Sequence, residues 1–114
     1  MEAFDLYAEL NQKTAQLNYS IKELRKNGTA YAEAERDYKV ALRTEVLKLR
    51  DEGQAVGIID KICYGIPSIA EARFKRDVAL TVYEANKEAI QSIKLQLRLI
   101  ENQISREWST PIND

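Results

Sequence analysis

The 114-residue sequence contains no histidine, one cysteine, two prolines, four glycines and one tryptophan. With a single cysteine the chain cannot form an internal disulfide, and without histidine or clustered cysteines it lacks the usual ligands of a zinc site. A catalytic triad or a general base that depends on imidazole is excluded for the same reason. Gly53–Gly57 lacks the lysine and hydroxyl residue of a phosphate-binding loop. We therefore expect a protein that needs no cofactor or metal and that is not an enzyme.

Long hydrophobic runs are also absent, and none approaches the ~20 apolar residues that a transmembrane helix requires. The first ten residues are interrupted by acidic side chains, which is unlike a signal peptide. The sequence therefore predicts a cytoplasmic protein that does not enter a membrane.

Apolar residues recur at alternating steps of three and four along most of the chain, which is typical of coiled-coil helices. In the first half this seam runs from Tyr7 to Leu49, and Gly53 suits the end of a helix. These signals predict a helix over about 3–51. Asn27–Thr29 has turn chemistry, so a kink at 27–29 stays open beside a continuous helix that carries a glycine at a cost of about 1 kcal/mol.

The second half repeats the seam from Ile69 to Ile104 and predicts a helix over about 68–108. Ser68 and Glu71 have the spacing of a capping box at its start. Between the halves, apolar residues from Val56 to Cys63 predict a short helix over about 55–64, in which Cys63 is a buried hydrophobic residue.

The predicted fold is all-α, with one helical domain over residues 1–114. It is a long antiparallel helical hairpin, coiled-coil-like, with a short helix at the turn. Pairing positions whose numbers sum to about 118 joins the two seams and places Gly28 opposite Ile90. Glu35 and Glu45 then fall near Tyr83, Arg76 and Arg73, and we interpret these polar interruptions as one layer whose charge pairs fix the register of the helices.

A two-helix hairpin needs one apolar stripe on each helix, and this sequence has more. A second row in the later helix consists of Val78, Val82, Ala85, Ala89, Leu95 and Leu99. In the earlier helix, the residues off the seam are Phe4, Leu6, Ala41 and Leu47. Such surface is usually covered by another helix, so we predict self-association, with a homodimer that forms a four-helix bundle favoured. The alternative is that the short helix folds down over the row.

Charge is distributed unevenly, although the net charge is only −1. Residues 36–76 contain nine basic and six acidic side chains, whereas residues 1–35 and 77–114 each contain four basic and six acidic ones. The candidate contacts to a protein partner or to nucleic acid are Arg36, Lys39, Arg43, Lys48, Arg50, Lys61, Tyr64, Arg73, Lys75 and Arg76. Such cations bind phosphates in a salt-dependent way, but pairing with nearby carboxylates on a solvated helix is the alternative.

The aromatic residues divide between the seam and the surface. Four tyrosines fall on the predicted seam and are expected to pack in the core: Tyr7, Tyr31, Tyr38 and Tyr83. Tyr19 and Tyr64 are then left for an interface, and Trp108 is a further anchor for a partner.

Two segments, Tyr31–Gly53 and Arg73–Trp108, resemble small uncharacterised helical proteins of temperate phages and prophages of Gram-positive bacteria. The resemblance covers about half of the chain, implies a bacterial host cell and carries no catalytic motif. Some small phage proteins of this kind are encoded among replication and recombination genes, and others antagonise host defences.

We therefore expect a non-catalytic phage protein that self-associates and binds a protein partner, either a host-defence nuclease or a phage replication or recombination protein. The first alternative is a nucleic-acid-binding or loading protein that uses the basic region near the turn. A structural or assembly factor of the virion is the second.

Overall fold

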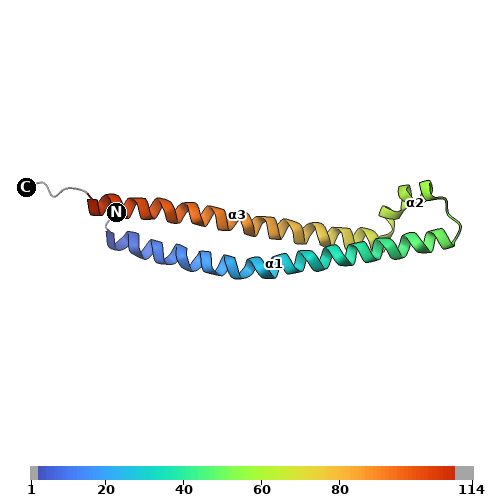
Figure 1. The fold of residues 1–114 in the computed structure, drawn as a ribbon, viewed down its shortest axis with the longest axis horizontal. Helices are drawn as coiled ribbons and strands as arrows, with labels where there is room; N and C mark the ends of the chain where they lie inside the picture. The colour runs from blue at the N-terminus through green and yellow to red at the C-terminus, as the bar shows by residue number, and fades with distance from the viewer. Residues whose placement is uncertain (1–2, 110–114) are drawn as a thin grey trace, which may run out of the picture. The chain divides into compact units, whose positions relative to one another are not determined.

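A computed structural model describes residues 3–109, and the regular structure of this part of the chain is entirely helical. Its elements are α1 (Ala3–Asp51), α2 (Val56–Ile62), the 3-10 helix η1 (Cys63–Gly65) and α3 (Pro67–Ser109) (Figure 1). The prediction of an all-helical chain with a short helix between two long ones is confirmed. Within residues 3–109, no helix is both long and apolar enough to cross a membrane.

A glycine cap ends α1. Gly53 has a φ of 86°, a left-handed conformation that glycine adopts at little cost. Its amide donates to the carbonyl of Arg50 at 3.0 Å, and the amide of Gln54 donates to the carbonyl of Leu49 at 3.1 Å. These two hydrogen bonds form a Schellman motif, which confirms the predicted role of Gly53.

The helix α1 continues through Asn27 and Gly28, so the turn chemistry of this pair does not interrupt it. At Gly28 the neighbouring helix comes close, because a Cβ atom there would lie 3.1 Å from Cε1 of Tyr83. The ring of Tyr83 also stacks on that of Tyr31, with centroids 6.2 Å apart. The need for space beside Tyr83 therefore explains a glycine that weakens the helix by about 1 kcal/mol.

The helix α3 begins at Pro67, one residue earlier than predicted. Proline suits the first helical position, because its φ is already helical and its missing N–H would be unpaired there. The amide of Ala70 donates to the carbonyl of Ile66 at 2.9 Å, so Ile66 flanks the first turn. Ser68 lies inside the helix, where its hydroxyl donates to Glu45 at 3.5 Å. The predicted capping box at Ser68 is therefore wrong.

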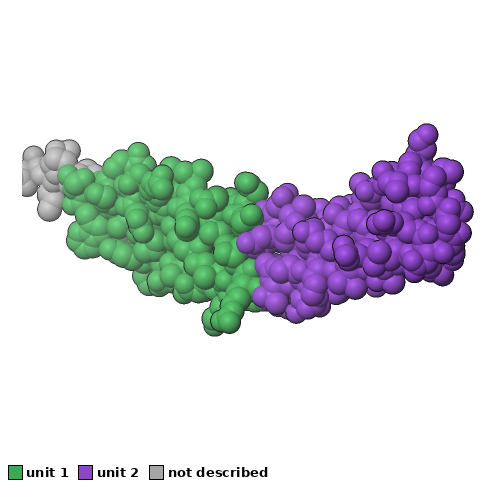
Figure 2. Space-filling model, turned by 45° about the vertical axis from the view of Figure 1, so that its right-hand side comes forward, with its two compact units in different colours: residues 1–25, 85–114 green, residues 26–84 purple. Residues whose placement is uncertain are grey.

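The chain divides into two compact units, which Figure 2 shows in different colours. Unit 1 comprises Met1–Arg25 and Ala85–Asp114, and unit 2 comprises Lys26–Glu84. Within each unit, α1 and α3 lie side by side in opposite directions (Figure 1). Each unit therefore has its own core between the two long helices, as a helical hairpin requires.

The core of unit 2 lies next to the turn between the long helices. Its buried residues are Tyr38, Ile59, Cys63 and Ile69. Because α2 contributes Ile59 and η1 contributes Cys63, the turn region packs onto both α1 and α3. Ile69 has no exposed surface, and truncation of such an isoleucine to alanine typically costs about 2–5 kcal/mol. The predicted burial of Cys63 is confirmed.

The core of unit 1 is built from Leu6, Ile100 and Ile104, with Leu10 packed against them. Leu6 is only 4% exposed, whereas Tyr7 is 43% exposed. The prediction placed Tyr7 on the seam and Leu6 off it, and the structure reverses the two. The physical reason is that the apolar row of an α-helix drifts against a strict seven-residue repeat, so neighbouring positions exchange roles along a long helix.

The two long helices of unit 2 pair in a register one heptad away from the predicted one. Gly28 meets Tyr83 rather than Ile90, and Glu35 pairs with Arg76, so the numbers of facing positions sum to about 111 instead of 118. Sliding one helix by seven residues again places seam positions against seam positions. Periodicity alone therefore cannot select between these two registers.

Candidate functional site

The ten predicted contact residues all lie in unit 2, but they do not form one basic surface. Several are paired with carboxylates: Arg36 with Asp37 at 3.1 Å, Lys39 with Glu35 at 3.6 Å and Lys75 with Glu71 at 3.8 Å. Unit 2 also contains ten acidic and ten basic side chains, so the excess of basic residues in 36–76 disappears when the whole unit is considered. For these three cations, the alternative that they pair with nearby carboxylates on a solvated helix surface is therefore the correct one.

Arg76 lies in the seam of unit 2, where its side chain is only 22% exposed. Its guanidinium carbon lies 4.4 Å from the ring centroid of Tyr38, and its Nε lies 3.7 Å from a carboxylate oxygen of Glu35. The hydrogen bond to Asp77, with the nearby negative charges of Asp77 and Glu35, raises the pKa of Arg76 above its ordinary value despite desolvation. Arg76 and Glu35 thus form a polar contact in the seam, whereas the predicted register placed Glu35 opposite Tyr83. Arg76 therefore faces α1 rather than an external partner.

The remaining cations are exposed and lie on several elements. Arg43 and Arg50 are spaced by seven residues, so they lie on one face of α1. Lys48 of α1 and Lys61 of α2 are also exposed. These positions are the ones at which unit 2 can offer positive charge to a ligand.

The turn region exposes an apolar surface of which only Tyr64 was predicted from the sequence. This surface, the tip patch, consists of Val56, Ile58, Ile62 and Tyr64. The guanidinium carbon of Arg73 lies 5.4 Å from the ring centroid of Tyr64, a favourable cation–π contact at the border of the patch. The available signal was the pair Ile58–Ile59, because adjacent residues of a short helix cannot both face the core.

The second row of α3 is exposed at all six predicted positions: Val78, Val82, Ala85, Ala89, Leu95 and Leu99. In unit 2, Val78 and Val82 retain about half of their surface, because α2 and η1 pack at Tyr38 and Ile69 instead. The alternative that the short helix folds over the row is therefore wrong for this part of it. These side chains are available to another helix, which is the condition that self-association requires.

Unit 2 also has a surface groove of about 340 Å³ between α1 and α3. Its lining residues are Ala30, Glu33, Ala34, Asp37, Ser68, Glu71, Ala72 and Lys75. The small side chains make the groove shallow, and its carboxylates are accompanied by Lys75. Within residues 3–109, no group of three or more acidic, cysteine or histidine side chains is arranged to hold a metal ion.

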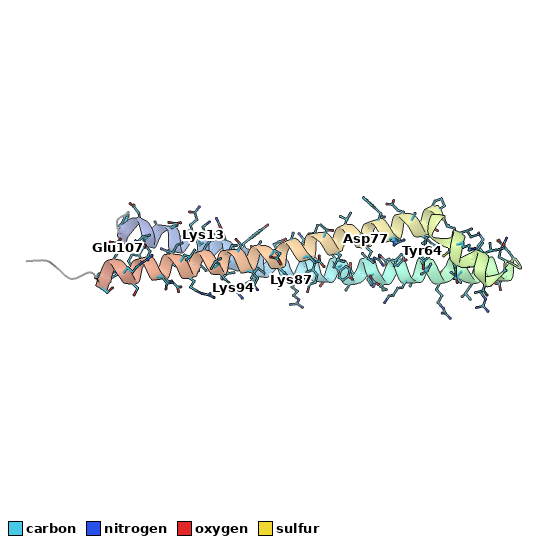
Figure 3. The ribbon with its side chains drawn as sticks, turned by 90° about the horizontal axis from the view of Figure 1, so that it is seen from above. Lys13, Tyr64, Asp77, Lys87, Lys94 and Glu107 are labelled. Atoms are coloured by element: carbon cyan, nitrogen blue, oxygen red, sulfur yellow. The ribbon has the colours of Figure 1, made fainter. Side chains whose placement is uncertain are left out.

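The chain matches no family model, no curated protein and no solved structure. The features on which a function can be built are therefore its surfaces, whose side chains Figure 3 draws. They are the exposed cations of unit 2, the tip patch and the second row of α3.

Proposed function

We propose that the chain is a non-catalytic phage-type interaction protein that self-associates and binds a protein partner in the bacterial cytoplasm. The observation that carries this proposal is the exposed second row of α3, including Val78, Val82, Leu95 and Leu99. Exposed apolar side chains that recur along a helix are commonly covered by another helix or protein. The resemblance of Tyr31–Gly53 and Arg73–Trp108 to small phage proteins supports the origin.

The tip patch supports binding of a second, different protein. It combines exposed aliphatic side chains with Tyr64 and Arg73, and tyrosine and arginine are residue types that often dominate the binding energy of interfaces. The patch residues belong to α2 and η1, whereas the row that supports self-association belongs to α3. The partner classes that we propose are a host-defence nuclease and a phage replication or recombination protein.

Two measurements test this function together. The mass of the free protein is measured in solution, and the tagged protein is used to capture partners from infected and uninfected host cells. We expect a dimer that captures one stoichiometric protein partner. Ile62→Glu in the tip patch should abolish capture of this partner, whereas Ala32→Glu on the exposed face of α1 should leave capture unchanged. A monomer that captures nothing contradicts the proposal, and large ordered oligomers support a virion assembly factor instead.

A second candidate function is binding of nucleic acid. The exposed cations Arg43, Lys48, Arg50 and Lys61 favour it, because within residues 3–109 the structure gives them no ion pair. Binding to single- or double-stranded DNA that weakens steeply as salt rises, and that Arg43→Glu reduces, supports this alternative. The absence of DNA binding at low salt removes it.

A further inference from the structure

One edge of unit 1 carries uncharged exposed side chains over about two turns of each long helix. This edge, the neutral edge, is built from Gln12, Gln16, Tyr19, Ser92, Gln96 and Leu99. The steps of four and three residues place the first three on one face of α1 and the last three on one face of α3. All six residues are exposed. In a chain of which 31% is charged, these six positions form an uncharged exposed strip, and the cores of protein interfaces are likewise depleted of charged residues.

The neutral edge contains both hollows and protrusions. A groove of about 520 Å³ is lined by Gln12, Gln16 and Tyr19 of α1 together with Ile93 of α3. A second groove, of about 320 Å³, is lined by Gln96, Leu99 and Ile100 of α3 and by Glu9 and Lys13 of α1.

At the rims of the grooves, Tyr19 is 65% exposed and Leu99 is 58% exposed. Leu95 is exposed beside them on α3. One surface that offers both knobs and holes can pack against a copy of itself.

The opposite edge of α3 in unit 1 is positively charged. Its residues are spaced by four, three and four positions: Lys87, Gln91, Lys94 and Arg98. Three of these four are cations. Figure 3 shows Lys87 and Lys94 on the same side of α3. A two-fold axis through that edge would bring these cations close to one another, and like charges that face each other disfavour association.

We propose that the neutral edge is the surface through which two copies of this chain associate. A two-fold axis places a surface against itself, so an uncharged edge meets an uncharged edge whichever way the two helix pairs run. The rim side chains Tyr19 and Leu99 of one copy then enter the grooves of the other. This inference rests on the self-association proposed above and assigns it to a defined surface.

The test is the dimer dissociation constant of the full chain, measured by sedimentation equilibrium for matched variants. Leu99→Glu and Gln16→Glu place a charge on the neutral edge, one on each helix. Gln91→Glu and Asn18→Glu place the same charge on the opposite edges of the same helices. All four side chains are exposed, so each variant is expected to keep the helical content of the unaltered protein, which circular dichroism checks.

We expect Leu99→Glu and Gln16→Glu to weaken the dimer at least ~10-fold, because each takes a carboxylate out of water in both copies. The two control variants are expected to stay within about twofold of the unaltered protein. A dimer that all four variants leave intact overturns the assignment to the neutral edge while the proposed self-association survives. A protein that is monomeric at high concentration overturns both the neutral-edge assignment and the proposed self-association. If that monomer forms a stoichiometric complex with a captured protein, the neutral edge is assigned to that partner instead.

Discussion

The contact between Gly28 and Tyr83 allows a test in which the sign of a stability change reports packing. Alanine has a helix propensity about 1 kcal/mol better than glycine, so Gly28→Ala should stabilise an isolated helix. In the folded protein its Cβ would lie 3.1 Å from Cε1 of Tyr83, shorter than the roughly 3.5–4.0 Å of an ordinary carbon–carbon contact. The ring cannot move freely, because it also stacks on Tyr31.

The expected result follows from the balance of these two effects. Overpacking by one methyl group typically costs about 1–3 kcal/mol, so Gly28→Ala should leave stability unchanged or lower it by up to about 2 kcal/mol. In a Tyr83→Ala background the ring is gone, and the same substitution should stabilise the protein by about 1 kcal/mol. The difference between the two backgrounds measures the close approach.

The assay is urea unfolding followed by circular dichroism at one fixed protein concentration, since association would change the apparent stability. Gly57→Ala is the matched control, because a Cβ at Gly57 in α2 meets no atom within 4 Å. It should stabilise the protein by about 0.4–1 kcal/mol in both backgrounds. Equal stabilisation by Gly28→Ala with and without the Tyr83 ring would refute the packing explanation for the glycine.

Three further predictions address other parts of the fold. Gly53→Ala should lower the free energy of unfolding by about 1–2 kcal/mol in urea titrations, because alanine is strained at a φ of 86°; an unchanged stability would mean that the Schellman motif relaxes. Arg76→Ala should cost about 1–2 kcal/mol through the lost contacts with Tyr38 and Glu35, whereas Arg36→Ala, whose ion pair is exposed, should cost less than about 0.5 kcal/mol; equal effects would argue against the polar layer. Cys63 is 2% exposed, so a thiol reagent should label the native protein at least ~100-fold more slowly than the protein in denaturant, and rapid native labelling would contradict its burial.

Local signals allowed the helices and one of their ends to be predicted. The Gly53 cap depends on residues next to it in sequence, and both long seams repeat over many turns, so neither needs knowledge of the partner helix. The start of α3 was misplaced because Ser68 satisfies the sequence pattern of a cap, while Pro67 competes for the same turn. The proline signal and the capping-box signal overlap within one turn, and the sequence alone does not show which of them sets the start of the helix.

The register of the hairpin depends on features that do not repeat. A seven-residue slide exchanges one set of apolar layers for another, whereas the fit of Gly28 to Tyr83 and of Glu35 to Arg76 occurs in one register only. Those pairs have no signature in a single sequence before the helices are placed together. The predicted polar layer included Glu35 and Arg76 among its members, but its register placed Glu35 opposite Tyr83, so the pair itself was not predicted.

The candidate surfaces were predictable to different degrees. The exposed row of α3 follows from counting apolar positions beyond those that a hairpin can bury, which is an argument about periodicity. The cations of unit 2 were harder, because an arginine such as Arg36 pairs with its sequence neighbour Asp37, while Arg76 turns into the seam. Charge counts along the chain do not distinguish these cases from an exposed cation such as Arg43.

The two units differ in how far apart their contacting residues lie in sequence, which has a consequence for the order of folding. In unit 2, Glu45 and Ser68 are 23 positions apart, whereas in unit 1 Tyr7 and Trp108 are 101 positions apart. Closing the longer loop first costs about 1.3 kcal/mol more in chain entropy, so unit 2 is expected to form first and unit 1 to close after it. The contacts that form last during folding are expected to break first in local unfolding, so unit 1 is expected to unfold before unit 2. A second copy bound at the neutral edge would stabilise unit 1 against this local unfolding.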